Sequence, residues 1–443
     1  MSVAGLPGRL ALADLHGSLS DPLLDAMTFL NEVTLRFPAA ISFAPGRPYE
    51  ALFDVDRIPD YLAAYADYLR GRGHTDEQLR ASVFQYGRTN GLIHELIAET
   101  VANDEGLRVP PESIVVTVGA QEGMLLALRA LFAGPDDVLL VSSPCYVGIT
   151  GAARLLDIEM VPVPEQPTGP DPDTVAAVAR RVRAGGRRPR AFYVVPDFAN
   201  PSGASMTVAA RQRLLKVAAA EGLTVIEDNP YGFFTRDPGF RPTLKSLDTE
   251  RVVIYLGSFA KTCFPGARLG YLLADQEVST PDGGSTLLAD QLAKIKSMIT
   301  VNTPSLSQAV IGGLLVSNGC RLRAANEPTI AFYRRNMQLL LDELDRLLPA
   351  GRRADLGIDW NTPDGGFFVL LTVPFVADEA AVDRSGREYG VLWTPMSPFY
   401  LDGGGRNQLR LSCSYVSPDR LVEGVGRLAA FLTDQAMSVA LGG

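Results

Sequence analysis

The chain has 443 residues, of which 47% are hydrophobic and 21% are charged, a composition typical of globular enzymes with a sizeable core. The formal net charge of −9 at pH 7 argues against a nucleic-acid partner, because nucleic-acid binding depends on clustered Lys and Arg. The first residues lack a signal-peptide pattern, and no apolar run is long enough to span a bilayer. We therefore expect a cytoplasmic protein that acts on small molecules, with no nucleic-acid or membrane partner.

The cysteines and histidines restrict the possible chemistry. Three histidines are too few and too far apart for a histidine metal site or an obvious catalytic triad, so we expect no metal. The four cysteines are scattered without C-x-x-C spacing, which predicts buried or incidental thiols rather than a zinc site or disulfides: Cys145, Cys263, Cys320 and Cys413. Any catalysis must depend on other residue types.

The predicted elements, taken in chain order, indicate two domains. A helix is predicted for residues 21–33, because Asp21 has the place of an N-cap and Pro22 that of the first helical residue. We expect this helix to pack against the smaller domain or a partner subunit. Residues 1–60 are expected to form an N-terminal arm and part of the small domain. Residues 61–310 are expected to form the large domain, and residues 311–443 the C-terminal small domain.

From about Ser113 onward, apolar runs alternate with amphipathic stretches. The runs typical of strands are "SIVVTV", "DVLLVSS", "EMVPVP", "AFYVVP", "LTVIED", "RVVIYLGS" and "RLGYLLA". The alternation predicts an α/β domain with a mostly parallel, seven-stranded sheet. After about Val301, two helical patterns and the strand patterns "GGFFVLLTV" and "QLRLSCSYV" predict a smaller α+β domain.

Several of the predicted strands end in residues that could bind a ligand, and ligands lie at such ends in parallel sheets. Residues 119–121 join a strand to an apolar helix, which suits an anion at the helix start but is also ordinary turn chemistry. Asn200 follows another strand and precedes a proline, a common turn. Glu227 and Asp228 end a third strand and must point to opposite faces. A carboxylate there is expected to be solvated or to face a cation, such as a protonated ring nitrogen.

Lysine is rare in this chain, so the positions of its five lysines are informative. Lys216, Lys294 and Lys296 lie in helical patterns and are predicted on helix surfaces. Lys261 alone follows a buried strand, where desolvation and nearby cations would lower the pKa of its amine and make it a usable nucleophile. These are the properties of a lysine that forms a Schiff base.

Other interpretations of the segment around Lys261 lack supporting context. Ser258-x-x-Lys261 matches a serine acyl-enzyme motif, but the S-D-N and K-T-G elements are absent. "GSFAKT" resembles the end of a P-loop, but the earlier glycines are missing. With a phosphate-bearing cofactor, Ser258 and Arg268 would hold the phosphate beside Lys261. Arg410, in a late predicted strand, suits bidentate binding of a carboxylate.

The ordered segments "YGRTNG", "VGAQEG", "SPCYVG", "NPSG", "EDNPYG", "SFAKTCFPGARLG" and "LRLS" resemble the fold-type I, class I/II aminotransferases, which use pyridoxal 5′-phosphate (PLP). The resemblance covers almost the whole chain and implies that fold. It implies that the Lys261 amine bonds the cofactor, that Asp228 faces the pyridine nitrogen and that Tyr146 stacks on the ring, which makes these three the catalytic residues. Asn200 and Tyr231 would donate to the ring hydroxyl.

The remaining implied residues bind the phosphate and the substrate. Arg410 would bind the substrate carboxylate, and Asn200 and Gly46 would also contact the substrate. Tyr86 would reach the phosphate of the neighbouring subunit, which implies a homodimer with shared active sites. The implied phosphate ligands within one chain are Ala120, Gln121, Ser258 and Arg268.

The implied activity is transfer of an amino group between an aromatic or arylglycine-type amino acid and a 2-oxo acid. "DPLLDAMTFLNEV", "ISFAPGRP" and "IKSMITVNTPS" are most similar to actinobacterial aminotransferases that make 4-hydroxy- and 3,5-dihydroxyphenylglycine for glycopeptide-type antibiotics. That similarity implies secondary metabolism. The resemblance to 2-aminoadipate and kynurenine aminotransferases is broader and weaker.

Some alternatives stay open at this stage. A β- or γ-replacement or a carbon–carbon bond-forming reaction would use the same fold and cofactor. Arg88, in place of the usual proline, and "TPMSPFY", in place of P-G-x-x-F, leave the amino acceptor open. A DNA-binding regulator of this fold is disfavoured by the short N-terminal segment and the negative charge. We expect two of five aromatic residues to line the substrate pocket: Phe43, Tyr146, Trp393, Phe399 and Tyr400.

Overall fold

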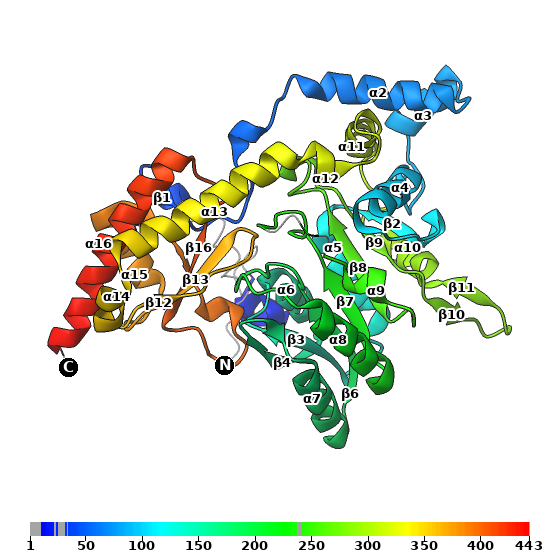
Figure 1. Ribbon diagram of the computed structural model, residues 1–443. Coiled ribbons are helices and arrows are strands. Elements are labelled where there is room, and N and C mark those ends of the chain that lie inside the picture. Colours follow the sequence, from blue (N-terminus) through cyan, green and yellow to red (C-terminus); the bar gives the residue numbers. More distant parts are fainter. Residues whose placement is uncertain are drawn as a thin grey trace.

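The structure is a computed structural model and describes residues 10–21, 24, 32, 34–236, 239 and 241–442 (Figure 1). Most of the helix predicted for residues 21–33 lies outside the described residues. Within the described part of the chain, no helix is long and apolar enough to cross a membrane. The four cysteines are buried and free, as predicted.

An eight-stranded sheet forms the centre of the larger part of the molecule, with the strand order β2-β9-β8-β7-β6-β3-β4-β5. Its strands are β2 (Ile114–Thr117), β3 (Asp137–Ser143), β4 (Glu159–Gln166), β5 (Gly169–Pro170), β6 (Arg188–Val194), β7 (Thr224–Asp228), β8 (Val253–Ser258) and β9 (Gly270–Leu273). The sheet is parallel except for β9 and β5, which run antiparallel to their neighbours. The seven predicted strands are confirmed. The predicted number was one too low, because the two-residue strand β5 pairs with the end of β4.

Helices cover both faces of this sheet, which explains why its strands are apolar on both sides. In β3, Val138 and Leu140 pack with α7, α8 and α9, whereas Leu139 and Val141 pack with α5 and α6 on the other face. The helices of this part are α2 (Arg57–Gly71), α3 (Asp76–Phe84), α4 (His94–Glu105), α5 (Gly119–Leu131), α6 (Val147–Leu155), α7 (Pro172–Ala184), α8 (Val208–Glu221), α9 (Leu244–Leu247), α10 (Leu288–Ile299), α11 (Ser305–Ser317) and α12 (Leu322–Ala325).

The C-terminal part has its own antiparallel sheet, in the order β12-β13-β16-β15, and its own apolar core. A parallel pair, β1 with β14, brings Ile41 and Phe43 from the N-terminal region into that core. The strands and helices of the C-terminal part are β1 (Ile41–Ser42), α13 (Glu327–Leu347), α14 (Ala350–Leu356), β12 (Asp359–Trp360), β13 (Phe368–Thr372), α15 (Glu379–Arg384), β14 (Val391–Leu392), β15 (Thr394–Pro395), β16 (Gln408–Ser412) and α16 (Pro418–Gly442). A hairpin of β10 (Glu277–Ser279) and β11 (Ser285–Leu287) projects from the large part.

The long helix α13 joins the two cores, as its diagonal course in Figure 1 shows. Ile330 and Tyr333 in its first half belong to the core of the large part, and Met337 and Leu340 belong to the C-terminal core. The predicted large α/β and smaller α+β parts are therefore confirmed as a fold class. The domain boundaries at residues 60 and 310 stay a prediction.

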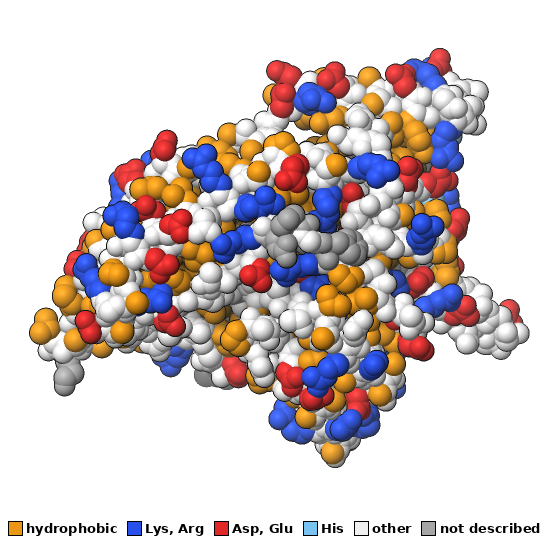
Figure 2. Space-filling view, viewed as in Figure 1, with side chains coloured by type: hydrophobic (Ala, Val, Ile, Leu, Met, Phe, Trp, Pro, Cys, Tyr) orange, Lys and Arg blue, Asp and Glu red, His pale blue; other side chains and the backbone are white. Residues whose placement is uncertain are grey.

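The basic run from Arg180 to Arg190 lies at the far end of α7 and the start of β6. Arg180 and Arg183 both bind Glu221, and Arg180 remains 70% exposed. Figure 2 shows Lys and Arg side chains gathered at the end of the molecule that α7 forms in Figure 1. This helix end is therefore solvated, and Arg180 and Arg183 are paired with a neighbouring carboxylate.

Candidate active site

A cavity of about 580 Å³ lies at the carboxyl edge of the large sheet, where the sheet faces the C-terminal part. All the predicted site residues except Tyr86 line it. The predicted residues that line the cavity are Gly46, Ala120, Gln121, Tyr146, Asn200, Asp228, Tyr231, Ser258, Lys261, Arg268 and Arg410.

Lys261 follows the end of β8 and lies in this cavity wall. Its Nζ donates a hydrogen bond to the carbonyl oxygen of Gly46 at 2.8 Å. Desolvation, together with the cations Arg410 and Arg268, lowers the pKa of Lys261 from 10.5 to about 8, although Asp228 opposes the shift. The amine is therefore a usable nucleophile near neutral pH, as the sequence predicted.

Asp228 and Glu227 end β7 on opposite faces, as the strand geometry predicted. Glu227 is fully buried and accepts hydrogen bonds from the backbone N–H groups of Leu244 (2.8 Å) and Lys245 (2.7 Å). Asp228 faces the cavity, and its Oδ2 accepts a hydrogen bond from the Tyr193 hydroxyl at 2.6 Å. Its Oδ1 is buried and has no hydrogen-bond partner among the described residues.

Burial raises the pKa of both carboxyl groups. The pKa of Glu227 is raised to about 8, and that of Asp228 to about 6, where the Tyr193 hydrogen bond and Lys261 limit the rise. Sequence reasoning did not identify Tyr193. The feature of the sequence that could have pointed to Tyr193 is its position as a lone tyrosine in the apolar strand before Asn200. It lies on the sheet face that Asp228 shares.

Arg410 in β16 brings a cation from the C-terminal part into the cavity. One Nη donates to Asn200 Oδ1, and the other donates to the Ala44 carbonyl at 2.7 Å and to Thr394 Oγ1 at 3.2 Å. The side chain is 4% exposed, and desolvation lowers its pKa to about 10. Its Nε has no partner among the described residues, so the guanidinium can bind a further anion.

The start of α5 and Arg268 together form the opposite, anion-binding end of the cavity. Gly119 has φ of +68°, and a Cβ on it would lie 2.8 Å from an Nη of Arg268. Only glycine therefore allows the guanidinium to approach the helix start so closely. The first N–H groups of a helix have no partner within it, and with Arg268 and Ser258 they suit a phosphate.

Two tyrosines line the cavity between these charged ends. Tyr146 is the N-cap residue of α6, and a Cβ on Gly148 would lie 2.2 Å from its ring, so the tight turn there requires glycine. Tyr231 packs edge-on against Phe367 and Phe368 at centroid distances of 5.3 and 5.5 Å. Burial raises the pKa of Tyr146 to about 12 and that of Tyr231 further, so both hydroxyls stay protonated and can donate.

Two of the five aromatic candidates line the cavity, which is the number expected: Tyr146 and Phe399. Phe43 and Trp393 are fully buried in the C-terminal core. The Tyr400 hydroxyl donates to Gln408 at 2.7 Å. These three candidates do not line the cavity, and sequence alone does not separate core aromatics from lining ones.

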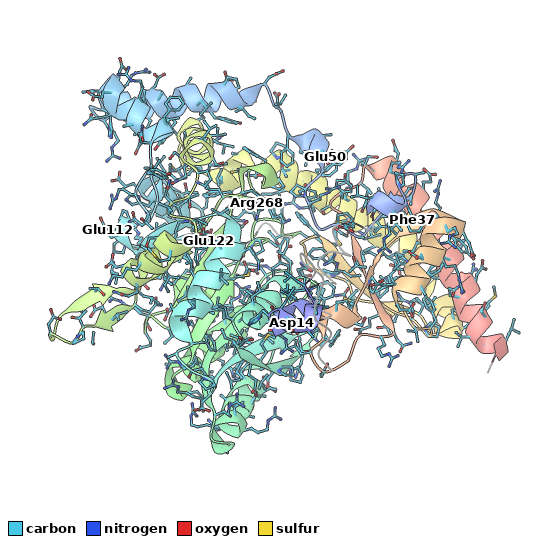
Figure 3. The ribbon with its side chains drawn as sticks, turned by 180° about the vertical axis from the view of Figure 1, so that it is seen from behind. Asp14, Phe37, Glu50, Glu112, Glu122 and Arg268 are labelled. Carbon is cyan, nitrogen blue, oxygen red and sulfur yellow. The ribbon has the colours of Figure 1, made fainter. Side chains whose placement is uncertain are left out.

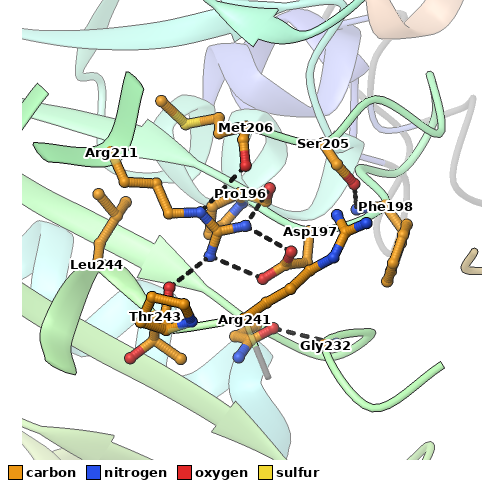
Figure 4. A network of polar contacts seen from close by, with 12 residues as sticks. Pro196, Asp197, Phe198, Ser205, Met206, Arg211, Gly232, Arg241, Thr243 and Leu244 are labelled. Atoms are coloured by element: carbon orange, nitrogen blue, oxygen red, sulfur yellow. Dashed lines mark hydrogen bonds and ion pairs between the residues drawn. The ribbon is translucent and has the colours of Figure 1, made fainter. Parts of the chain in front are cut away.

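The loop of residues 196–206 carries Asn200 and is held by Arg211 of α8 (Figure 4). Arg211 is 1% exposed, and all five of its guanidinium N–H groups are used. They donate to both carboxylate oxygens of Asp197 and to the carbonyl oxygens of Pro196, Met206 and Pro242. The two ends of the loop are thereby tied together, which positions Asn200 against Arg410.

Tyr86 lies apart from the cavity and is 84% exposed. Its predicted role concerns the neighbouring subunit, so one chain does not test it. Phe84 beside it is 80% exposed, and Met298 is 84% exposed.

The unpartnered atoms of the cavity match the functional groups of PLP. Asp228 Oδ1 can accept from a protonated pyridine nitrogen, and the α5 start with Arg268 can bind a phosphate. Lys261 has the lowered pKa that a bond to the cofactor carbonyl requires. The residues present therefore fit this cofactor.

Comparison with known proteins agrees with this chemistry. The family model for aminotransferase class I and II matches residues 57–428. The chain belongs to this aminotransferase family. It is a PLP-dependent aminotransferase of fold type I that acts on an amino acid and a 2-oxo acid, and transamination is supported over β- or γ-replacement.

The relatives of this aminotransferase cover nearly its whole length. It is 50% identical over 434 residues to the (S)-3,5-dihydroxyphenylglycine transaminase of Amycolatopsis orientalis, with 98% of this chain and 97% of the relative covered. An archaeal alanine:glyoxylate aminotransferase structure matches with a TM-score of 0.80 and 26% identity, covering 96% and 99% of the two chains. The α-aminoadipate aminotransferase of Thermus thermophilus, complexed with N-(5′-phosphopyridoxyl)-L-leucine, matches with a TM-score of 0.77 and 29% identity, covering 97% and 100%.

Proposed function

We propose that this aminotransferase moves an amino group between (S)-3,5-dihydroxyphenylglycine, or a closely similar arylglycine, and a 2-oxo acid. The observation that carries the proposal is the 50% identity to a dihydroxyphenylglycine transaminase over 98% of the chain. The similarity of sequence segments to antibiotic-pathway aminotransferases extends the proposal to a role in secondary metabolism.

In the proposed mechanism, Lys261 is the base. PLP, when bound, supplies a ring that takes up the electrons released when the Cα–H bond of the amino acid breaks. Lys261 Nζ would take the proton from Cα of the amino acid and would then return it on the cofactor side. The pKa of about 8 supports this role, because part of the amine is then neutral near pH 7.

Asp228 and Arg410 are proposed to hold the cofactor and the amino acid in position. Asp228 Oδ1 would keep a proton on the pyridine nitrogen, and its lack of another partner among the described residues supports that assignment. Arg410 would bind the α-carboxylate through its free donor capacity, with Asn200 and Gly46 beside it. Asn200 and Tyr231 would donate to the ring hydroxyl of the cofactor.

The lining of the cavity is consistent with an aryl group close to Cα. In an arylglycine the ring is attached directly to Cα, so it must lie beside the reacting atoms. Phe399 and Tyr146 offer aromatic surface there, and Met124 and Val147 offer apolar surface.

We also propose that the enzyme is a homodimer in which Tyr86 enters the partner's cavity and reaches its phosphate site. Exposed apolar side chains support the proposal, because Phe84, Tyr86 and Met298 would otherwise remain in water. Sedimentation analysis gives the mass of the assembly. A monomer at working concentrations would contradict the proposal.

The substrate proposal is tested with the full-length enzyme loaded with PLP. Cofactor absorbance is followed in single turnovers with (S)-3,5-dihydroxyphenylglycine, (S)-4-hydroxyphenylglycine, tyrosine and 2-aminoadipate, and the released acids are identified by mass spectrometry. We expect kcat/KM for an arylglycine to exceed that for 2-aminoadipate by at least about tenfold, with release of the matching 2-oxo acid.

Two results would contradict the proposal in different ways. A preference for 2-aminoadipate or tyrosine would keep the aminotransferase assignment but change the substrate class. A change in cofactor absorbance without release of a 2-oxo acid would instead indicate replacement or bond-forming chemistry.

A further inference from the structure

Lys296 was predicted on a helix surface, and the structure contradicts this prediction. Its side chain in α10 is 0% exposed, whereas Lys294 on the same helix is exposed. Lys296 Nζ donates to Glu122 Oε2 at 2.8 Å, to Glu122 Oε1 at 3.0 Å and to Thr300 Oγ1 at 2.8 Å. All three N–H groups of the ammonium are therefore used.

Glu122, the partner of Lys296, is equally well satisfied. Its Oε1 also accepts from Thr300 Oγ1 at 2.6 Å, and its Oε2 accepts from the backbone N–H of Val118 at 2.6 Å. Burial lowers the pKa of Lys296, and the hydrogen bond and charge of Glu122 oppose that shift. The two side chains form a closed, buried ion pair.

This ion pair lies at the start of α5, the helix whose first residues line the candidate phosphate site. Glu122 is in the first turn of α5, whose start, with Arg268, forms the anion-binding end of the cavity. Figure 3 labels both Glu122 and Arg268. Val118, whose N–H the carboxylate holds, precedes Gly119, so the pair also fixes the turn into the helix.

A carboxylate in this position has two opposite effects on a phosphate. It orders the backbone whose N–H groups bind the anion, but its negative charge repels that anion. Repulsion between charges inside a protein is weakly screened. The ammonium of Lys296 cancels the charge of Glu122 while leaving the Val118 contact intact.

We propose that Lys296 is a positioning residue for the cofactor phosphate: it neutralises Glu122 and thereby allows that carboxylate to order the start of α5 without repelling the phosphate. The inference concerns cofactor affinity and does not depend on which amino acid is the substrate. A purely structural ion pair would stabilise the fold without distinguishing a phosphorylated ligand from an unphosphorylated one.

The test compares PLP with pyridoxal, which lacks the phosphate, on the cofactor-free full-length protein. Dissociation constants are measured by absorbance for the wild type, Lys296→Met, Lys296→Met/Glu122→Gln and Lys294→Met. Lys294→Met is the matched control, because it makes the same change on an exposed position of the same helix.

We expect Lys296→Met to weaken PLP binding by about 30-fold, because Glu122 is left uncompensated near the phosphate. Pyridoxal binding should change by less than about threefold, because pyridoxal has no charge at that end. The double variant should return PLP affinity to within about threefold of the wild type, because both charges are gone. Lys294→Met should change neither constant.

Equal weakening for both ligands would overturn the proposal and leave a structural ion pair. Unchanged PLP affinity in Lys296→Met would overturn it as well. If Lys296→Met alone does not fold, the double variant decides the question, since a neutral pair tolerates burial. PLP affinity far below the wild type in a folded double variant would then contradict the proposed charge compensation.

Discussion

The cavity wall and the polar networks behind it use the same residue types in different ways. In the wall, Asp228 Oδ1 and Arg410 Nε have no partner among the described residues, and Lys261 Nζ donates to Gly46. In the networks behind it, every N–H group of Lys296 and of Arg211 is used.

The difference separates groups that react or bind from groups that hold the structure. An unused donor or acceptor in a buried place is costly unless a ligand completes it. A saturated ion pair has no capacity left for a ligand, and its loss is expected to affect stability or geometry.

The largest effect is expected for Lys261→Ala. The variant loses the base and the amine that bonds the cofactor, so kcat should fall by about 10⁴-fold or more. Lys216→Ala, on the exposed face of α8, is the control and should retain full activity. Steady-state kinetics measure both, and substantial activity in Lys261→Ala would remove that lysine from the mechanism.

The next largest effect is expected at Asp228, which is compared with its neighbour Glu227 on β7. Asp228→Asn should lower the rate of the half-reaction by about 10³-fold, because a neutral amide no longer stabilises the ring nitrogen as a cation. Glu227→Gln should instead lower stability, by about 1 to 3 kcal/mol, through its disturbed backbone hydrogen bonds, with little change in rate. Stopped-flow absorbance and urea denaturation separate the two outcomes. A slow half-reaction in Glu227→Gln would contradict the comparison.

A smaller effect, on stability, is expected for Arg211→Met. The change leaves Asp197 buried and unpaired, so the free energy of unfolding should fall by about 3 kcal/mol. Arg213, which lies on the same helix as Arg211, is exposed and binds Asp173 of α7. Arg213→Met should therefore leave the denaturation midpoint unchanged. Equal midpoints for the two variants would show that the Asp197 network contributes nothing to stability.

The smallest effect concerns the pH dependence of Lys261. Its folded pKa of about 8 lies below the usual 10.5, so the reactive neutral amine predominates above pH 8 and is lost as the pH falls below it. The rate of PLP incorporation into the cofactor-free protein should therefore rise with a midpoint near pH 8. Arg410→Gln removes one of the responsible cations and should move that midpoint upward. A midpoint near 10.5 in the wild type would contradict the lowered pKa of Lys261.

Much of the fold and of the cavity could be predicted from the sequence, for a physical reason. Strands that helices cover on both faces are buried and appear as apolar runs, so β2, β3, β6, β7, β8 and β9 were recognisable. Residues that follow such strands meet at one edge of the sheet. Asn200, Asp228 and Lys261 were therefore predictable as neighbours.

Features that depend on distant partners could not be predicted in the same way. The burial of Lys296 depends on Glu122, which is 174 residues away, and its local pattern is that of an exposed helix. The hydroxyl of Tyr193 acquires its role only when β6 and β7 pair. Tyr86 stays a prediction, because its proposed contact belongs to a second subunit.

The assignment of Lys261 can be tested by identifying the lysine that bonds the cofactor. The PLP-loaded enzyme is treated with borohydride, which makes the bond between cofactor and protein permanent, and the tagged peptide is identified by mass spectrometry. With five lysines in the chain, the result is unambiguous. We expect the tag on Lys261 alone. A tag on Lys245, Lys296 or another lysine, or no tag, would contradict it.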